Sequence, residues 1–278
     1  MISINPLTTM WHNSSATVRL IIVNTGIFAL IILGRLVASL CNSGIMVELM
    51  PLIECPDSML MLASRPWTLL TYMFVHADLF HLIFNMLWLY WFGSVFMLTG
   101  ISRQIYFLYI AGGIAGALMF VAVGTTPPWH SYGLLAGSSA SVMAVVTATT
   151  VLHPDYRWNM IIFGEVALKW VAVITIVIAM LGDGSRIAHI GGASAGIIYA
   201  VVLTRGRDLS AFLSRYNCHR KNAKSSTSGF NKASGGSRTN EEQLDEILDK
   251  VRRSGYASLS SSEKKRLIDI SRHTKDNV

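Results

Sequence analysis

Residues 74–91 read FVHADLFHLIFNMLWLYW, an apolar stretch interrupted by His76, His81 and Asn85. A helix needs about 20 mostly apolar residues to cross a bilayer. Polar side chains inside such a helix are costly and usually face a cavity or another helix. His81 and Asn85 are four residues apart and therefore share one helix face. The stretch predicts a membrane-spanning helix with a polar face in its first half.

The rest of the chain has the same apolar character. Of its 278 residues 52% are hydrophobic and only 14% are charged, and the mean hydropathy is +0.46, which excludes an ordinary soluble domain. Runs long enough to span a bilayer lie near 17–40, 78–98, 104–123, 136–152, 162–181 and 187–204. We therefore predict an all-α membrane protein, a bundle of six transmembrane helices with a small helical C-terminal appendage.

Charge divides the chain into a neutral core and a basic tail. The formal net charge is +7, yet basic and acidic residues balance before Arg205, so the whole excess lies in the tail. We predict a membrane core over 1–205, a basic flexible linker over 206–239 and a cytoplasmic helical hairpin over 240–278. Asn240 would cap the first helix of this hairpin, and Ser262 or a neighbour the second. The tail has no nucleic-acid motif, so we expect no nucleic-acid partner.

The basic tail also predicts the orientation, because Lys and Arg concentrate in cytoplasmic segments. An even number of spans then places both termini in the cytoplasm, with the first span uncleaved. The segments 41–77, 124–135 and 182–186 would face outward. Three helices that begin at the outer surface thus carry polar clusters at a similar depth: the helix quoted above, the helix that starts AGSSAS at 136, and the helix that starts RIAHIGGASAG at 186.

Small residues predict which of these helices pack closely. Gly192 and Gly196 lie on the same helix face as His189 and form a GxxxG step. Alanines recur every fourth residue beside Ser139, at 136, 140, 144 and 148. Close packing of the two helices would bring Ser139 within hydrogen-bond reach of His189, the arrangement that activates a serine hydroxyl. His81, Asn85 and the Ser139 amide could then donate hydrogen bonds to an oxyanion.

With these residues the chain resembles the rhomboid family of intramembrane serine proteases, in its bacterial form. The resemblance covers about residues 15–205 and is carried by H-x4-H-x3-N at His76, His81 and Asn85, by Gly137-Ser138-Ser139, and by A-H-x-x-G-x-x-x-G at Ala188, His189, Gly192 and Gly196. It implies an endopeptidase in which Ser139 is the nucleophile, His189 is its base in a dyad without aspartate, and His81, Asn85 and the Ser139 amide form the oxyanion hole. His76 would organise the loop and helix around it.

The resemblance also implies the setting of this activity. Substrates would be transmembrane proteins cut near the outer membrane boundary, within the lipid bilayer of the cell (inner) membrane. No metal or other cofactor is required. The sequence carries no signal for an oligomeric state.

Three residues depart from the family pattern. Ala140 replaces a glycine, which predicts altered packing with activity retained. Met143 stands where a tyrosine often supports the histidine, so we expect a more loosely held base. Thr68 follows Trp67 where the family has an arginine, and Arg65 lies on the other side of a proline.

Several alternatives stay open at this point. The chain could be a catalytically inactive rhomboid-like protein that binds transmembrane clients, although the intact serine and histidine argue against it. It could be a small transporter, although the polar clusters lie only in the outer half. Cys41 and Cys55 could pair or remain free thiols. Asp183 could orient His189, although an unconnected loop aspartate is the simpler interpretation.

Overall fold

The computed structural model describes Trp11 and residues 14–123, 133–160, 164–181 and 185–211, together with Ile247, Ser260, Ser262, Glu263 and Leu267 in the tail. The chain forms two compact units, Met1–Arg220 and Lys221–Val278.

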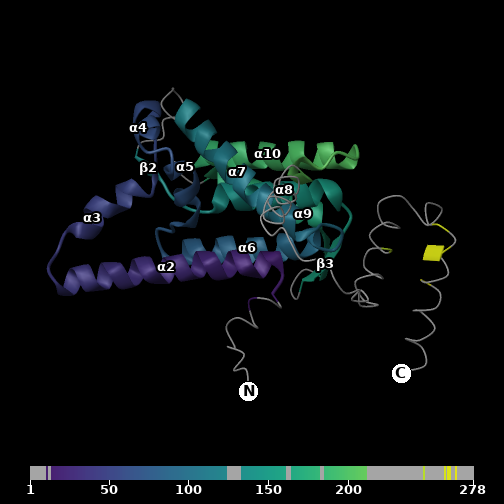
Figure 1. Ribbon diagram of the computed structural model, residues 1–278, viewed down its shortest axis with the longest axis horizontal. Helices are drawn as coiled ribbons and strands as arrows, with labels where there is room; N and C mark the ends of the chain where they lie inside the picture. The colour runs from purple at the N-terminus through teal and green to yellow at the C-terminus, as the bar shows by residue number, and fades with distance from the viewer. Residues whose placement is uncertain are drawn as a thin grey trace, which may run out of the picture. The chain divides into compact units, whose positions relative to one another are not determined.

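Apolar helices make up most of the first unit (Figure 1). Four of them are long and apolar enough to cross a membrane: α2 (Ala16–Leu40), α6 (Leu79–Phe96), α7 (Ser102–Val123) and α10 (Arg186–Thr204). Two more, α8 (Ser139–Leu152) and α9 (Leu168–Leu181), are apolar but shorter. Apart from the start of α9, the helices lie close to the predicted apolar runs, and side-chain caps begin α2 and α6. Ser15 Oγ accepts from Val18 N at α2, and Asp78 Oδ1 accepts from His81 N at α6.

The predicted loop over 41–77 contains short regular elements. These are α3 (Ile45–Leu49), the 3₁₀ turn η1 (Met50–Leu52), the strand β1 (Cys55–Pro56), α4 (Met59–Ser64), α5 (Thr68–Thr71) and the 3₁₀ turn η2 (Tyr72–Phe74). Cys41 is exposed, Cys55 is buried, and both are free thiols. Burial raises the pKa of Cys55 to about 11, which keeps this thiol protonated and unreactive.

Two pairs of short antiparallel strands depart from the predicted all-α fold. The strand β1 pairs with β2 (Leu134–Leu135), so the first loop is joined to the chain just before Ser139. The strands β3 (Arg157–Met160) and β4 (Gly164–Ala167) form a hairpin. The predicted helix over 162–181 was therefore wrong at its start. Residues 164–167 pair with β3, and Leu168 begins α9.

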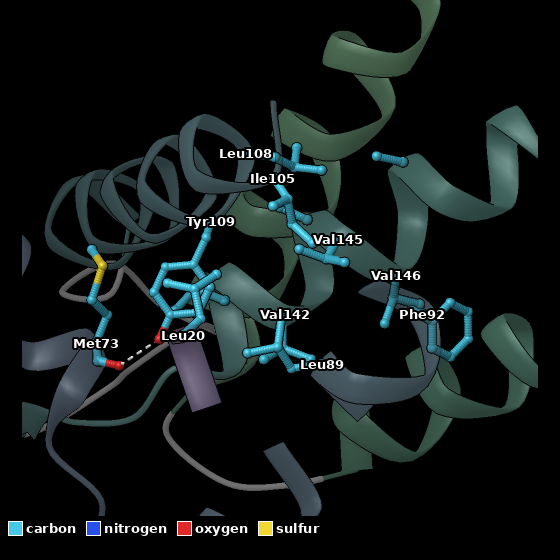
Figure 2. Close-up of a cluster of buried hydrophobic side chains, with 14 of the residues drawn as sticks. Leu20, Met73, Leu89, Phe92, Ile105, Leu108, Tyr109, Val142, Val145 and Val146 are labelled. Atoms are coloured by element: carbon cyan, nitrogen blue, oxygen red, sulfur yellow. Dashed lines mark hydrogen bonds between the residues drawn. The ribbon is translucent and has the colours of Figure 1, made fainter. Parts of the chain in front are cut away.

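Helices α7, α8 and α10 pack against one another through small residues. A side chain at Gly112 would collide with Ala144 Cβ, and one at Gly116 would collide with Ala140 Cβ. Large apolar side chains then fill the space toward α6 and α2, which lies alongside α6 (Figures 1 and 2). Fully buried members of this core are Leu89, Phe92, Ile105 and Val145. The alanine and glycine positions thus hold α8 between its neighbours.

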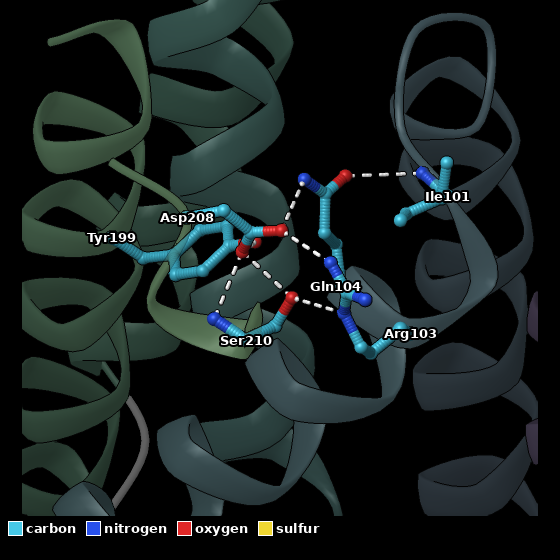
Figure 3. A network of polar contacts seen from close by, with 6 residues as sticks. All are labelled: Ile101, Arg103, Gln104, Tyr199, Asp208 and Ser210. Atoms are coloured by element: carbon cyan, nitrogen blue, oxygen red, sulfur yellow. Dashed lines mark hydrogen bonds and ion pairs between the residues drawn. The ribbon is translucent and has the colours of Figure 1, made fainter. Parts of the chain in front are cut away.

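Asp208, just after α10, ties that helix to the start of α7 (Figure 3). Its carboxylate accepts hydrogen bonds from Arg103 Nη2 at 2.9 Å, Gln104 Nε2 at 3.2 Å and Tyr199 Oη at 3.3 Å. The Oγ of Ser210, in the short turn η3 (Leu209–Ala211), donates to Asp208 at 2.6 Å. This network fixes the end of the bundle opposite the first turn of α10.

The second unit is described at five residues only. Ser260 N donates to Glu263 Oε2 at 2.7 Å, and Glu263 N donates to Ser260 Oγ at 3.3 Å. This reciprocal pair is a capping box, the usual start of a helix. Ser260 is therefore the neighbour of Ser262 that takes the predicted capping role. The remainder of the predicted hairpin, and most of the predicted linker, lie outside the described residues.

Candidate active site

Ser139 and His189 meet at the centre of the candidate site. Ser139 is the first residue of α8, and His189 lies in the first turn of α10 and is 8% exposed. His189 Nε2 lies 2.9 Å from Ser139 Oγ, a hydrogen-bond distance. The structure therefore brings together the two residues that the sequence analysis paired.

Glycines on α10 make this approach possible. A Cβ added to Gly192 would lie 2.7 Å from the Ala140 carbonyl carbon and closer still to its oxygen. A Cβ added to Gly196 would lie 2.8 Å from Ala144 Cα. Both neighbours are backbone atoms of α8, which cannot move aside as a side chain can. The predicted close packing of these two helices is confirmed.

The other ring nitrogen of His189 has a partner that the sequence analysis missed. His189 Nδ1 lies 3.1 Å from the carbonyl oxygen of Ala179, in the last turn of α9. A neutral imidazole carries one N–H, so Nδ1 donates to the carbonyl and Nε2 is left to accept the Ser139 hydroxyl hydrogen. Met143 is buried and supplies no strong hydrogen-bonding group to the ring, so the Ala179 carbonyl is the partner that the structure gives to this side of His189.

Ser138 precedes Ser139 but has a different partner. Its Oγ lies 3.0 Å from His76 Nε2, and both residues are fully buried. Burial, and then the nearby His81, lower the pKa of His76 to about 4, so this ring is neutral near pH 7. The two adjacent serines thus contact two different histidines, and only Ser139 contacts His189.

His81, on α6, lies against the turn that leads to Ser139. Gly137 has a φ of +121°, and a Cβ there would lie 2.5 Å from His81 Cε1 and 2.8 Å from His81 Nε2. Only glycine therefore permits both this backbone conformation and the approach of the His81 ring. Asn85 is buried, and its Nδ2 donates to the His81 carbonyl at 2.8 Å, which uses one of its two amide hydrogens.

The loop before α6 is anchored in spite of its departure from the family pattern. Arg65 Nη1 donates to the Pro51 carbonyl at 3.0 Å, and Trp67 Nε1 donates to the Leu52 carbonyl at 2.7 Å. Thr68 Oγ1 donates to the Arg65 carbonyl at 2.7 Å. Arg65 thus reaches the loop backbone from the other side of the proline.

Two buried tyrosines that the sequence analysis did not single out support the turn before Ser139. Tyr72 donates through its hydroxyl to the Gly113 carbonyl at 2.6 Å, and its carbonyl accepts from Gly137 N at 3.0 Å. Tyr109 Oη donates to the Met73 carbonyl at 3.1 Å, as Figure 2 shows. A buried tyrosine hydroxyl needs a hydrogen-bond partner. The position of both tyrosines within apolar stretches of the sequence could therefore have marked them as residues that tie helices together.

The arrangement supplies the parts of a serine hydrolase. A hydroxyl is paired with an oriented imidazole, the Ser139 amide lies at the start of α8, and His81 of α6 lies against the turn that leads to it. Among the described residues, no group of three or more His, Cys, Asp or Glu side chains is placed to hold a metal ion.

Comparison with known proteins gives matches over the core and the tail. A family model described as the Rhomboid domain matches residues 63–206. A second model, for a family of unknown function termed DUF6576, matches residues 236–273.

Individual relatives match about half of the chain. RHOMBOID-like protein 12, mitochondrial, from Arabidopsis thaliana is 27% identical over 165 residues, covering 52% of this chain and 48% of the relative. Inactive rhomboid-related protein 2 from Caenorhabditis elegans is 27% identical, covering 52% and 43%. Rhomboid-related protein 1 from the same organism is 25% identical, covering 51% and 41%. The chain thus spans less than half the length of these relatives.

The Rhomboid model covers more than half of the chain, and the matched residues contain Ser139, His189 and the α6 residues His81 and Asn85. The chain belongs to the rhomboid family.

Proposed function

We propose that the protein is an intramembrane serine endopeptidase that cuts membrane-anchored proteins near the outer membrane boundary. The single observation that carries the proposal is the 2.9 Å contact between Ser139 Oγ and His189 Nε2. A serine placed for helix packing alone has no need of an imidazole aligned with its hydroxyl.

In this mechanism Ser139 Oγ attacks the scissile carbonyl while His189 Nε2 takes the hydroxyl proton. The negative charge that develops on the carbonyl oxygen is met by the Ser139 N–H, the His81 ring and the free Asn85 amide hydrogen. Collapse of the tetrahedral intermediate breaks the peptide C–N bond, and His189 returns the proton to the leaving amine. Water then hydrolyses the acyl-enzyme by the same steps.

The short helix α8 supports a site below the membrane surface. Its 14 residues extend about 21 Å, against a hydrocarbon core of about 30 Å. A helix that begins at Ser139 and ends at the far boundary would leave its serine several ångströms inside the bilayer. We propose that α8 and α9 cross together with the four longer helices, with both termini in the cytoplasm.

A client-binding protein without protease activity is the second candidate, because one relative is named inactive. The Ser139–His189 contact favours the protease. The test is to incubate the purified full chain with a generic transmembrane substrate in detergent, beside Ser139→Ala. Cleavage by the wild type and none by the variant is expected. Binding without cleavage by the wild type would favour the client-binding function.

A further inference from the structure

The second ring nitrogen of His189 contacts the end of another helix, and the proposed mechanism does not yet use this contact. His189 Nδ1 lies 3.1 Å from the Ala179 carbonyl oxygen. We infer that the C-terminal end of α9, through this carbonyl, is the positioning group of the base, in the place that a carboxylate holds in three-membered serine hydrolase sites. The inference rests on the proposed protease function.

The position of Ala179 explains why its carbonyl is available. Helix α9 ends at Leu181, so Ala179 lies in the last turn. The last four carbonyls of a helix have no partner within the helix and must find one elsewhere. The His189 Nδ1–H supplies such a partner from α10.

The C-terminal end of α9 also places a partial negative charge near His189. The peptide dipoles of a helix sum to a partial negative charge at its C-terminus, which favours a cation nearby. His189 is neutral in the resting enzyme and becomes an imidazolium as Ser139 attacks. The Ala179 carbonyl therefore fixes the resting tautomer and then stabilises the charge that forms, which are the two roles of the carboxylate in a triad.

The Ala179 contact lies at the end of α9 whose side chains are least buried within the protein. The buried residues of α9, Leu168, Val171, Ala172 and Thr175, all lie in its first eight residues. Nearer the end, Ile178 is 61% exposed and Leu181 is 78% exposed. The carbonyl can therefore be weakened at this end without creating a cavity in the core.

An amide-to-ester replacement tests the inference in the full chain. Replacing Met180 by its α-hydroxy analogue converts the Ala179–Met180 amide to an ester and makes the Ala179 oxygen a weaker acceptor. The matched control replaces Ile178 by its α-hydroxy analogue. This ester makes the Val177 carbonyl oxygen a weaker acceptor and removes one backbone N–H from the same helical turn, but it leaves the Ala179 carbonyl unchanged. Both proteins are compared with the wild type by kcat, KM, Tm and the ¹⁵N shifts of the His189 ring, which report its tautomer.

The ester at 180 should lower kcat about threefold to tenfold with KM unchanged, the range for one net hydrogen bond. It should also increase the Nε2–H tautomer, whereas the ester at 178 should change neither. Equal effects of the two esters, or no effect of either, would overturn the inference. The tautomer readout needs no turnover, so it tests the carbonyl contact even if the wild type cleaves no substrate, an outcome that would defeat the proposed function itself.

Asp183 supplies a further test, since it lies outside the described residues but close to His189 in sequence. Asp183→Asn should leave kcat and the His189 tautomer unchanged. Loss of a triad carboxylate lowers kcat about 10⁴-fold elsewhere. A loss of that order here would give the positioning role to Asp183 and overturn the assignment to Ala179.

Discussion

The Gly192→Ala substitution tests whether helix packing holds the serine and the histidine together. The added methyl carbon would lie 2.7 Å from the Ala140 carbonyl carbon and 2.9 Å from its Cα, whereas ordinary contact begins at 3.4 Å. Because these neighbours are backbone atoms, α10 must move away from α8 by about 1 Å, since protein interiors hold no spare space.

That movement acts directly on the site. The Ser139–His189 distance of 2.9 Å would lengthen beyond hydrogen-bond range. Misplacement of catalytic groups by about 1 Å costs roughly 10²-fold in rate. Overpacking also costs about 1–3 kcal/mol of folding free energy. We therefore expect kcat to fall about 100-fold in a protein that still folds, with a lower Tm.

The matched control is Gly26→Ala in α2, because a Cβ at Gly26 would meet no atom within 4 Å. The same chemical change should there leave kcat unchanged and Tm equal or slightly higher, as alanine favours helix. Cleavage of a transmembrane substrate and thermal unfolding, measured on the same preparations, check both variants. Wild-type kcat in Gly192→Ala would refute the reasoning.

Three further predictions concern the oxyanion donors, the far end of the bundle and the tail. His81→Ala and Asn85→Ala should each lower kcat roughly 10²- to 10³-fold with Tm nearly unchanged; a fall in stability at wild-type rate would assign them to helix packing instead. Burial alone would raise the pKa of Asp208, but the hydrogen bonds that its carboxylate accepts (Figure 3) hold this pKa below the ordinary aspartate value. Asp208→Asn should therefore cost about 1.5–3 kcal/mol of unfolding free energy while the wild-type carboxylate is ionised, and the gap to wild type should close as acid protonates it; a gap independent of pH would contradict this. A chain ending at Thr227 should fold and cleave in detergent, and inactivity in a folded product would make the tail an obligatory part of the enzyme.

The helix positions could be predicted because runs of about 20 apolar residues mark helices that can cross a bilayer. The ends of α2, α7 and α10 differ from the predicted ends by no more than two residues. The β3–β4 hairpin was missed because residues 161–168 read IIFGEVAL, an apolar run with the single charge of Glu165 that continues into α9. Trp158 of β3 packs against Phe92, with ring centroids 5.0 Å apart, and a contact of this kind leaves no periodic signal.

The side-chain contacts of the candidate site could be predicted from the sequence, but its backbone contacts could not. The meeting of Ser139 with His189 follows from side-chain identity and from the glycine step on α10, both of which a sequence displays. The Ala179 contact is made by a backbone carbonyl, which every residue carries, so no pattern of residue types can indicate it. The strand pairing of Cys55 with Leu135 escaped prediction for the same reason.

The proposed mechanism requires that His189 activates Ser139 and no other serine. Incubation of the folded protein with a fluorophosphonate, followed by mass spectrometry of the peptides, measures this reactivity without any substrate. We expect one adduct, on Ser139, that is absent from Ser139→Ala and His189→Ala and retained in Ser138→Ala. An adduct on Ser138, or labelling of Ser139 that persists without His189, would contradict the account.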